Sequence, residues 1–460
     1  MFRQRLGKLP LDILDALTLA VLVGVSYALF IRALSVTPLL PGIDGPYYAV
    51  QVRWLFEYGR LKYLDPPLTF YLMAILSTFT GDIFTGVKVT VALFTALTSI
   101  PLYVFFREVY DDRLGGMGAT IAFALNFYTY RLLGDFMKNS IGLLWLCFYF
   151  YFLYKYWTKG DRSSFVFSSA FLILAALTHV LDYGVCVLFT TLMPFMALIL
   201  RRESKRAFIA FAVCALTLLF FFTFPVLIGY DVFKGLWFVS EVSGTSSTPS
   251  GSPSPLFLVE FLFRKGVAAW LSIVILLVLG LEGVYRKDYH RGAFLLILAG
   301  IGAFLNFPLL PRRWLFRFQL MSCIPIAFAT GALVSRAKEL SVKMIIVMIF
   351  VALLFSTNPF IDRGLRPSIP PGEYREIRAV IERFVEDREN VVLVVPDVRV
   401  KYWVETFADN VVKRPPRDFT GRLLLMLEKR HLRWVPPRAR PVYIGKFIIV
   451  FDITVHHRRM

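Results

Sequence analysis

Two carboxylates in the first third of the sequence stand where they could accept a proton. Asp44 lies two residues before Pro46, which suits the first turn of a helix, and Asp135 lies three residues before Lys138. A positioned carboxylate can act as a general base, and a lysine can hold an anion as a point charge. We therefore predict that Asp44 and Asp135 are catalytic and that Lys138 binds an anion. A helix-capping role for Asp44 and a solvated charge cluster around Asp135 are the alternative interpretations.

Three arginines form a second group, late in the apolar part of the chain. Arg312, Arg313 and Arg317 occur in the stretch LLPRRWLFR. Guanidinium groups bind phosphate oxygens in a bidentate manner, and a lipid phosphate lies at the edge of a bilayer. The three arginines are therefore predicted to bind a lipid phosphate. Simple extension of their side chains toward lipid headgroups is the alternative.

Weaker candidates are Lys62, Asp65 and His179. Asp65 directly precedes Pro66-Pro67-Leu68, and His179 follows a long apolar run. A hydrogen-bonded histidine at a helix end is at least as good an interpretation of His179 as a ligand. We expect no nucleotide cofactor, because the sequence has neither a phosphate-binding P-loop motif nor a Gly-rich dinucleotide fingerprint. The metal requirement is left open, with a divalent cation near the carboxylates as the form it would take.

The composition places these residues in a membrane protein. The chain is 57% hydrophobic and 16% aromatic over 460 residues, with the apolar residues gathered in runs of about 20. The formal net charge of +19 comes largely from Lys and Arg in short loops between these runs. That placement indicates contact with the lipid bilayer and argues against a nucleic-acid partner.

The fold class predicted is an α-helical multi-pass membrane protein with a small extracytoplasmic α/β domain at its C-terminus. The domains expected are a transmembrane catalytic domain at 1–357 and a soluble domain at 358–460. Eleven spans are predicted, at about 13–32, 87–106, 114–130, 140–157, 164–179, 184–200, 207–229, 266–284, 292–310, 316–335 and 343–357.

Orientation depends on the short apolar run at 67–80. It falls below the roughly 20 residues that cross a bilayer, so we expect it to enter without crossing. Basic loops then gather on the side of the N-terminus, as the positive-inside rule requires. This predicts a plasma-membrane protein with a cytoplasmic N-terminus. Its candidate residues and C-terminal domain would lie outside, and the helix after Pro46 would lie along the interface.

The C-terminal domain is predicted to contain helices at 373–386, 400–407 and 421–430 and strands at 390–396 and 446–451. The centre of a long loop at 230–265, from Ser243 to Pro255, is rich in Ser, Thr, Gly and Pro and has the composition of a flexible linker. We expect either a lid or a tolerated long loop there.

These features together resemble the GT-C superfamily of membrane glycosyltransferases, such as protein O-mannosyltransferases and aminoarabinose transferases. The resemblance rests on an early outer acid (Asp44), a Pro-Pro-Leu at 66–68, a second outer acid (Asp135) and the late arginines. It implies a polyprenyl-phosphate-linked sugar donor, with Asp44 as general base and the arginines on the carrier phosphate. Asp65 stands where those relatives have His or Lys, so Lys62 is a candidate substitute.

The function predicted is transfer of a sugar from the polyprenyl-phosphate carrier to an acceptor hydroxyl on the outer face. The acceptor is unknown and can be protein, lipid or glycan. A transporter or flippase of a polyprenyl-linked sugar is the alternative. Charges gathered on one face, with spans nearly free of them, favour the enzyme.

Overall fold

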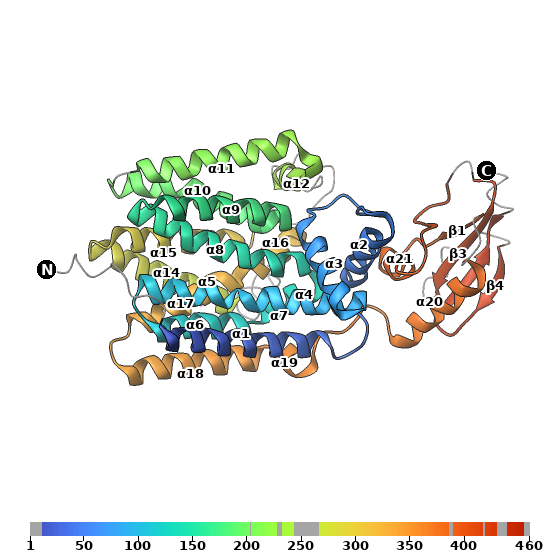
Figure 1. Cartoon of the computed structure of the whole chain (residues 1–460), viewed down its shortest axis with the longest axis horizontal. Coiled ribbons are helices and arrows are strands. Elements are labelled where there is room, and N and C mark those ends of the chain that lie inside the picture. The colour runs from blue at the N-terminus through green and yellow to red at the C-terminus, as the bar shows by residue number, and fades with distance from the viewer. Residues whose placement is uncertain are drawn as a thin grey trace. The chain divides into compact units, whose positions relative to one another are not determined.

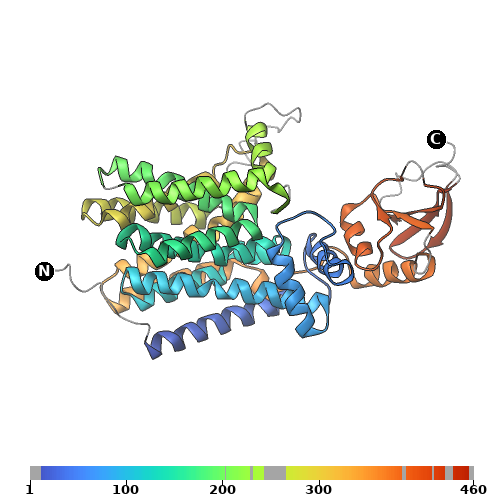
Figure 2. The ribbon, with the colours of Figure 1, turned by 45° about the horizontal axis from the view of Figure 1, so that its top comes forward.

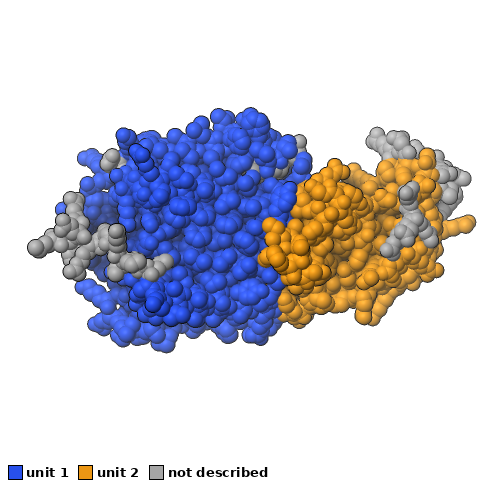
Figure 3. All heavy atoms as spheres, viewed as in Figure 1, with its two compact units in different colours: residues 1–33, 64–72, 89–364 blue, residues 34–63, 73–88, 365–460 orange. Residues whose placement is uncertain are grey.

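The computed structural model describes residues 12–202, 204–227, 232–242, 266–385, 390–416, 419–429 and 439–454. The chain forms two compact units, coloured separately in Figure 3. The helical unit comprises residues 1–33, 64–72 and 89–364. The mixed unit comprises residues 34–63, 73–88 and 365–460. Two N-terminal segments, 34–63 and 73–88, therefore belong to the same compact unit as the C-terminal part of the chain.

The helical unit is a bundle of long helices that run roughly side by side (Figures 1 and 2). Helix α8 packs on α9, α14 on α15 and α6 on α17. Phenylalanine rings fill the core, with Phe105 and Phe294 stacked at 5.0 Å between ring centroids and Phe150 and Phe189 at 4.7 Å. Its elements are α1 (Ile13–Leu34), α4 (Ile83–Leu97), α5 (Ser99–Val109), α6 (Arg113–Leu125), α7 (Phe127–Asp135), α8 (Met137–Lys159), α9 (Arg162–Thr178), α10 (Val180–Ile199), α11 (Lys205–Thr223), α12 (Val232–Val242), α14 (Val267–Tyr285), α15 (Tyr289–Leu305), α16 (Arg312–Gln319), α17 (Cys323–Arg336), α18 (Leu340–Thr357) and α19 (Phe360–Arg363).

Within the part of the chain that the structure describes, seven helices are long and apolar enough to cross a membrane by length and composition. They are 13–34, 83–109, 180–199, 205–223, 267–285, 314–336 and 340–357, and four shorter apolar helices accompany them at 68–80, 113–125, 162–178 and 289–305. The predicted fold class, a helical multi-pass chain with a small α/β part near its C-terminus, is confirmed. Helix α3 (Leu68–Thr80) coincides with the short run that we predicted not to cross.

The structure corrects the predicted span at 114–130 and the loop that was expected to follow it. Helix α6 ends at Leu125, Asn126 is extended, and its side chain accepts a hydrogen bond from the Tyr128 amide at 2.9 Å. An asparagine side chain competes with the helical backbone bonds and caps the next helix instead. Helix α7 then runs to Asp135, and α8 begins one residue after Phe136.

A buried carboxylate ties three helices of the bundle together. Asp15 on α1 is fully buried and accepts hydrogen bonds from the Tyr103 hydroxyl at 2.7 Å, Arg107 Nε at 3.1 Å and Arg113 Nε at 2.8 Å. These donors lie on α5 and α6. The partners supply the hydrogen bonds and positive charge that a buried carboxylate needs.

The mixed unit is built on a five-stranded sheet of order β2-β1-β3-β5-β4. Strand β1 is parallel to β2 and to β3, whereas β5 is antiparallel to both β3 and β4. The elements are α2 (Gly45–Tyr58), α20 (Pro371–Phe384), α21 (Val398–Glu405), β1 (Val391–Val394), β2 (Val411–Val412), β3 (Arg422–Glu428), β4 (Arg440–Ile444) and β5 (Ile448–Asp452). The predicted helices at 373–386 and 400–407 and the strands at 390–396 and 446–451 are confirmed.

The helix predicted at 421–430 is wrong, because this segment is strand β3. Its residues Leu423 to Leu427 are all buried between β1 and β5. A central strand covered on both faces has a continuous apolar run, which periodicity cannot distinguish from a buried helix.

Candidate active site

Asp44 directly precedes helix α2 in the mixed unit and is half-buried. Its backbone carbonyl accepts the first hydrogen bond of the helix, from the Tyr48 amide at 3.3 Å. Its carboxylate does not cap α2, all of whose residues the structure describes. The simple capping interpretation therefore does not account for the side chain.

The segment before Asp44 is fixed by backbone contacts. The buried Lys88 ammonium donates to the carbonyls of Thr37 at 2.6 Å and Pro38 at 3.0 Å. The Gly42 amide donates to the Arg366 carbonyl at 2.9 Å. Gly42 has φ 72°, a conformation that a residue with a Cβ rarely adopts. These contacts position the backbone on which Asp44 stands.

Three tyrosine rings gather one turn into α2. Tyr47 lies 5.3 Å from Tyr402 and 5.8 Å from Tyr63 between ring centroids, and Tyr63 lies 6.1 Å from Tyr402. The Tyr63 hydroxyl donates to Glu405 at 2.7 Å. Because Tyr402 and Glu405 belong to α21, the C-terminal part of the chain contributes directly to the surroundings of α2.

Lys62 lies in the mixed unit and forms an ion pair with the buried Glu405 at 2.9 Å. Its ammonium also lies 5.0 Å from the centre of the Trp54 ring. Burial lowers the pKa of Lys62, and the Glu405 carboxylate opposes that shift. The structure therefore gives Lys62 a protein partner in this conformation.

The charged face of α2, the helix that was expected to lie along the membrane interface, contacts protein. Arg53 pairs with Asp409 and with Glu57 at 3.1 Å, and the Tyr58 hydroxyl also donates to Asp409. Burial opposes ionisation of Asp409, but the hydrogen bond from Tyr58 and the charge of Arg53 outweigh it and hold its pKa below the usual value.

The lowered pKa of Asp409 predicts a pH-dependent contribution to stability. The carboxylate stabilises the fold above its ordinary pKa of about 3.8 and loses that effect as pH falls through its lower folded-state pKa. Asp409→Asn is expected to lower the unfolding free energy by about 1 kcal/mol at pH 7 and by progressively less below pH 4. Thermal unfolding at several pH values measures the difference. The exposed Asp362→Asn serves as control, and an equal loss at every pH would contradict the assignment.

The junction of α7 and α8 gathers the candidates of the helical unit. Lys138, in the first turn of α8, forms an ion pair with Asp65, and both side chains are buried. Asp135 forms an ion pair at 2.6 Å with Arg131, which lies one turn earlier on α7. The Lys138 ammonium therefore neutralises the buried Asp65 carboxylate, which explains how an acidic residue is tolerated directly before the Pro-Pro-Leu at 66–68.

A third carboxylate lies close to the same junction. Asp182, in the first turn of α10, is fully buried and lies 3.2 Å from His179 Nδ1. The Asn139 amide, in the orientation that satisfies its neighbours, donates to both Asp182 oxygens, at 2.9 and 3.2 Å. Asn139 follows Lys138 directly. His179 therefore belongs to a buried network that supports the start of α8.

Arg317 lies on α16, which begins at Arg312. Its guanidinium is 5.9 Å from the centre of the Phe136 ring, at the α7–α8 junction. The Arg131 guanidinium of α7 lies 5.6 Å from the centre of the Phe316 ring on α16. The side chains of Arg312 and Arg313 lie outside the described residues, as does most of the predicted lid at 230–265.

The structure thus brings Asp65, Asp135, Lys138, His179 and Arg317 to one junction within the helical unit and places Asp44 and Lys62 in the mixed unit. Neither Asn139 nor Asp182 was among the site residues predicted from the sequence. A charged residue within an apolar run, as at Asp182, is a usable signal of function.

A family model described as a 6-pyruvoyl-tetrahydropterin synthase related (PTPS-related) domain, membrane protein, matches residues 61–362, which is more than half of the chain. The chain belongs to this family. The PTPS-related chain is therefore a membrane protein. Its sequence matches no curated protein.

The PTPS-related chain shares its fold with three solved structures. ArnT from Cupriavidus metallidurans, bound to undecaprenyl phosphate, is 13% identical, with a TM-score of 0.57 over 94% of this chain and 97% of that one. The Archaeoglobus fulgidus oligosaccharyltransferase, in complex with Zn and sulfate, is 16% identical, with a TM-score of 0.56 over 88% and 63%. The arabinofuranosyltransferase AftD from Mycobacteria is 15% identical, with a TM-score of 0.53 over 97% and 40%. The chain therefore shares its fold with these three proteins, as the resemblance in sequence features predicted.

Within the described ranges of the PTPS-related chain, no group of three or more His, Cys, Asp or Glu is placed to hold a metal ion. Asp65 and Asp135 are each paired with a cation.

Proposed function

We propose that the chain is a membrane glycosyltransferase that moves a sugar from a polyprenyl-phosphate carrier to an acceptor hydroxyl. The observation that carries the proposal is the shared fold with ArnT over nearly the full length of both chains. ArnT was crystallised with undecaprenyl phosphate, a lipid of the carrier class. The other two neighbours are named as glycosyl-transferring enzymes. We place the reaction on the outer face of the plasma membrane, with the N-terminus in the cytoplasm.

Asp44 is the proposed general base. It is a half-buried carboxylate whose side chain does not cap α2, and the backbone before it is fixed by Lys88 and Gly42. Asp44 would take the proton of the acceptor hydroxyl while that oxygen forms a bond to the anomeric carbon. The bond from the anomeric carbon to the carrier phosphate breaks, and its electron pair leaves on the phosphate oxygen. A single displacement of this kind inverts the anomeric centre.

Arg312, Arg313 and Arg317 are proposed to hold the carrier phosphate and stabilise its growing negative charge. Lys138 contributes positive charge at the α7–α8 junction, where Asp65 fixes its ammonium. Asp135 is proposed to orient Arg131 at the same junction, through their ion pair.

Purified protein in lipid nanodiscs, supplied with polyprenyl-phosphate sugars, tests the proposal. Release of polyprenyl phosphate only when an acceptor mixture is added is the expected result. Movement of the intact donor across the bilayer without release would instead identify a flippase.

Arg317→Ala is expected to raise the KM for donor by about tenfold to hundredfold, the loss typical of hydrogen bonds to a charged group. The value of kcat should change much less, because the arginine binds the phosphate in the ground state as well. Steady-state kinetics with varied donor measures both constants. Arg375→Ala, on the exposed surface of α20, is the matched control. An unchanged donor KM would show that Arg317 only anchors α16.

A further inference from the structure

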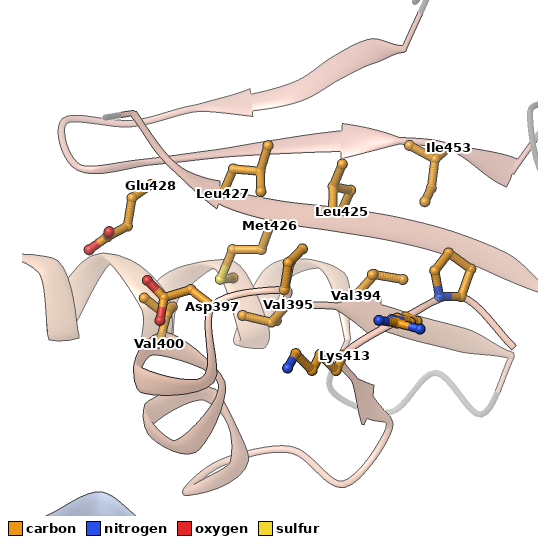
Figure 4. A pocket seen from close by; sticks show the side chains of 13 residues that line it. Val394, Val395, Asp397, Val400, Lys413, Leu425, Met426, Leu427, Glu428 and Ile453 are labelled. Carbon is orange, nitrogen blue, oxygen red and sulfur yellow. The ribbon is translucent and has the colours of Figure 1, made fainter. Parts of the chain in front are cut away.

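A cavity of about 620 Å³ lies in the mixed unit, at one edge of its sheet (Figure 4). Its walls include Val394 at the end of β1, Leu425 and Leu427 on β3, and Ile453 after β5. These four side chains belong to one apolar cluster on a single face of the sheet. The volume falls within the roughly 300–1,000 Å³ of small-molecule sites.

The cavity occupies the position that open α/β sheets use for binding. It lies at the carboxyl ends of the parallel strands β1 and β3, which are neighbours in the sheet. From β1 the chain passes through α21 to β2 on one side, whereas from β3 it continues to β4 and β5 on the other. Adjacent parallel strands whose connections leave in opposite directions form a topological switch point, where a crevice opens and ligands bind.

The charged residues that line the cavity fall into two groups. Asp397 and Glu428 lie together at one end, away from Ile453 (Figure 4), and Arg399 pairs with Glu428 and lies 3.7 Å from Asp397. Lys413 and Arg414, which directly follow β2, are exposed and also line the cavity. Neither forms an ion pair with a described residue. The acids therefore have a cationic partner in the protein, and the adjacent cations are available to an anion from solution.

We propose that this cavity binds a small molecule with one phosphate or carboxylate group on an apolar body. Lys413 and Arg414 would hold the anionic group, and Val394, Leu425 and Leu427 would contact the apolar part. Arginine suits either anion through its two parallel donors, and lysine adds a point charge. The site is separate from the proposed transferase residues, none of which lines the cavity.

The test uses the full-length protein in nanodiscs of a zwitterionic lipid, with binding measured by isothermal titration calorimetry. Phenyl phosphate and benzoate are the two anionic probes, and inorganic phosphate and phenol each lack one half of the ligand. At least one anionic probe should bind, more tightly than both half-ligands. The tighter of phenyl phosphate and benzoate then identifies the preferred anion. The double variant Lys413→Gln with Arg414→Gln should weaken that binding by roughly tenfold or more, as expected when charge-assisted hydrogen bonds are removed.

Two controls separate this site from the proposed transferase site. Arg440→Gln with Lys446→Gln removes the same charge from exposed positions outside the cavity and should leave binding unchanged. Arg317→Ala should also leave it unchanged, whereas loss of binding in that variant would assign the probe to the carrier-phosphate site. The proposal is overturned if the Lys413/Arg414 variant, with an unaltered circular dichroism spectrum, binds as the wild type does. It is likewise overturned if neither anionic probe binds more tightly than its half-ligands.

Discussion

Asp44→Asn is expected to reduce the rate of sugar transfer by about 10²–10⁴-fold, the contribution typical of a positioned general base. Asparagine keeps the size of the side chain but cannot take up the acceptor proton. The fold should be retained, because the Asp44 carboxylate does not cap α2 and its backbone contacts are unchanged. The initial rate of polyprenyl phosphate release, at saturating donor and acceptor, measures the effect.

The matched control for Asp44 is the exposed Asp362→Asn, which changes the same charge and should retain wild-type activity. Asp44→Glu keeps a base at a displaced position and should recover part of the rate. Donor KM should stay close to that of the wild type if Asp44 acts only on the acceptor. Activity of Asp44→Asn within threefold of the wild type would remove Asp44 from the mechanism.

Asp65→Asn is expected to lower the unfolding free energy by about 3–5 kcal/mol, because it leaves the buried Lys138 ammonium without its anionic partner. The double variant Asp65→Asn with Lys138→Met removes both charges and should recover most of that stability. Breaking a buried pair is costly, whereas replacing both members is often close to neutral. Chemical or thermal unfolding of the single and double variants measures these differences, since the pair is coupled only if their effects are non-additive.

The activity of the double variant shows whether the Asp65–Lys138 pair only stabilises the fold or also takes part in the reaction. If Lys138 supplies charge to the donor phosphate, the stable double variant should remain at least about tenfold less active than wild type. Full activity in the double variant would show that Lys138 serves only to neutralise Asp65. The single variant is assayed well below its unfolding temperature, so that lost activity is not confused with lost protein.

The sequence predicted best those elements whose burial is one-sided. Helix α20 buries Ile377, Val380, Ile381 and Phe384, a spacing that only a helix brings to one face. Most of the apolar spans were also predicted, because a bilayer requires long apolar runs, but the span at 114–130 was placed wrongly, since its helix ends at Leu125. Strand β3 failed for the opposite reason, since it is covered on both faces and its apolar run has no periodicity.

The candidate residues were identified by type, and their partners were not. Asp135 and Arg131 are four residues apart on one helix, so their pairing follows from local geometry. Asp65 and Lys138 are 73 residues apart, and Lys62 is still farther from Glu405. Contacts of this range are set by how helices pack, and no local pattern encodes them.

By itself, then, the sequence determined that this is a helical multi-pass membrane protein with a small α/β part, and it identified acids and arginines suited to transfer from a lipid phosphate. The helical repeat of apolar residues and the length of an apolar run are local features, so both can be recognised in the sequence alone. Only the tertiary structure decided that Lys138 neutralises Asp65, that Asn139 and His179 hold the buried Asp182, and that α2 packs against α21. A buried charge needs an ionic or hydrogen-bonding partner, and a buried apolar surface needs another surface to pack against. In each of these cases the partner is a residue that the local sequence pattern does not identify.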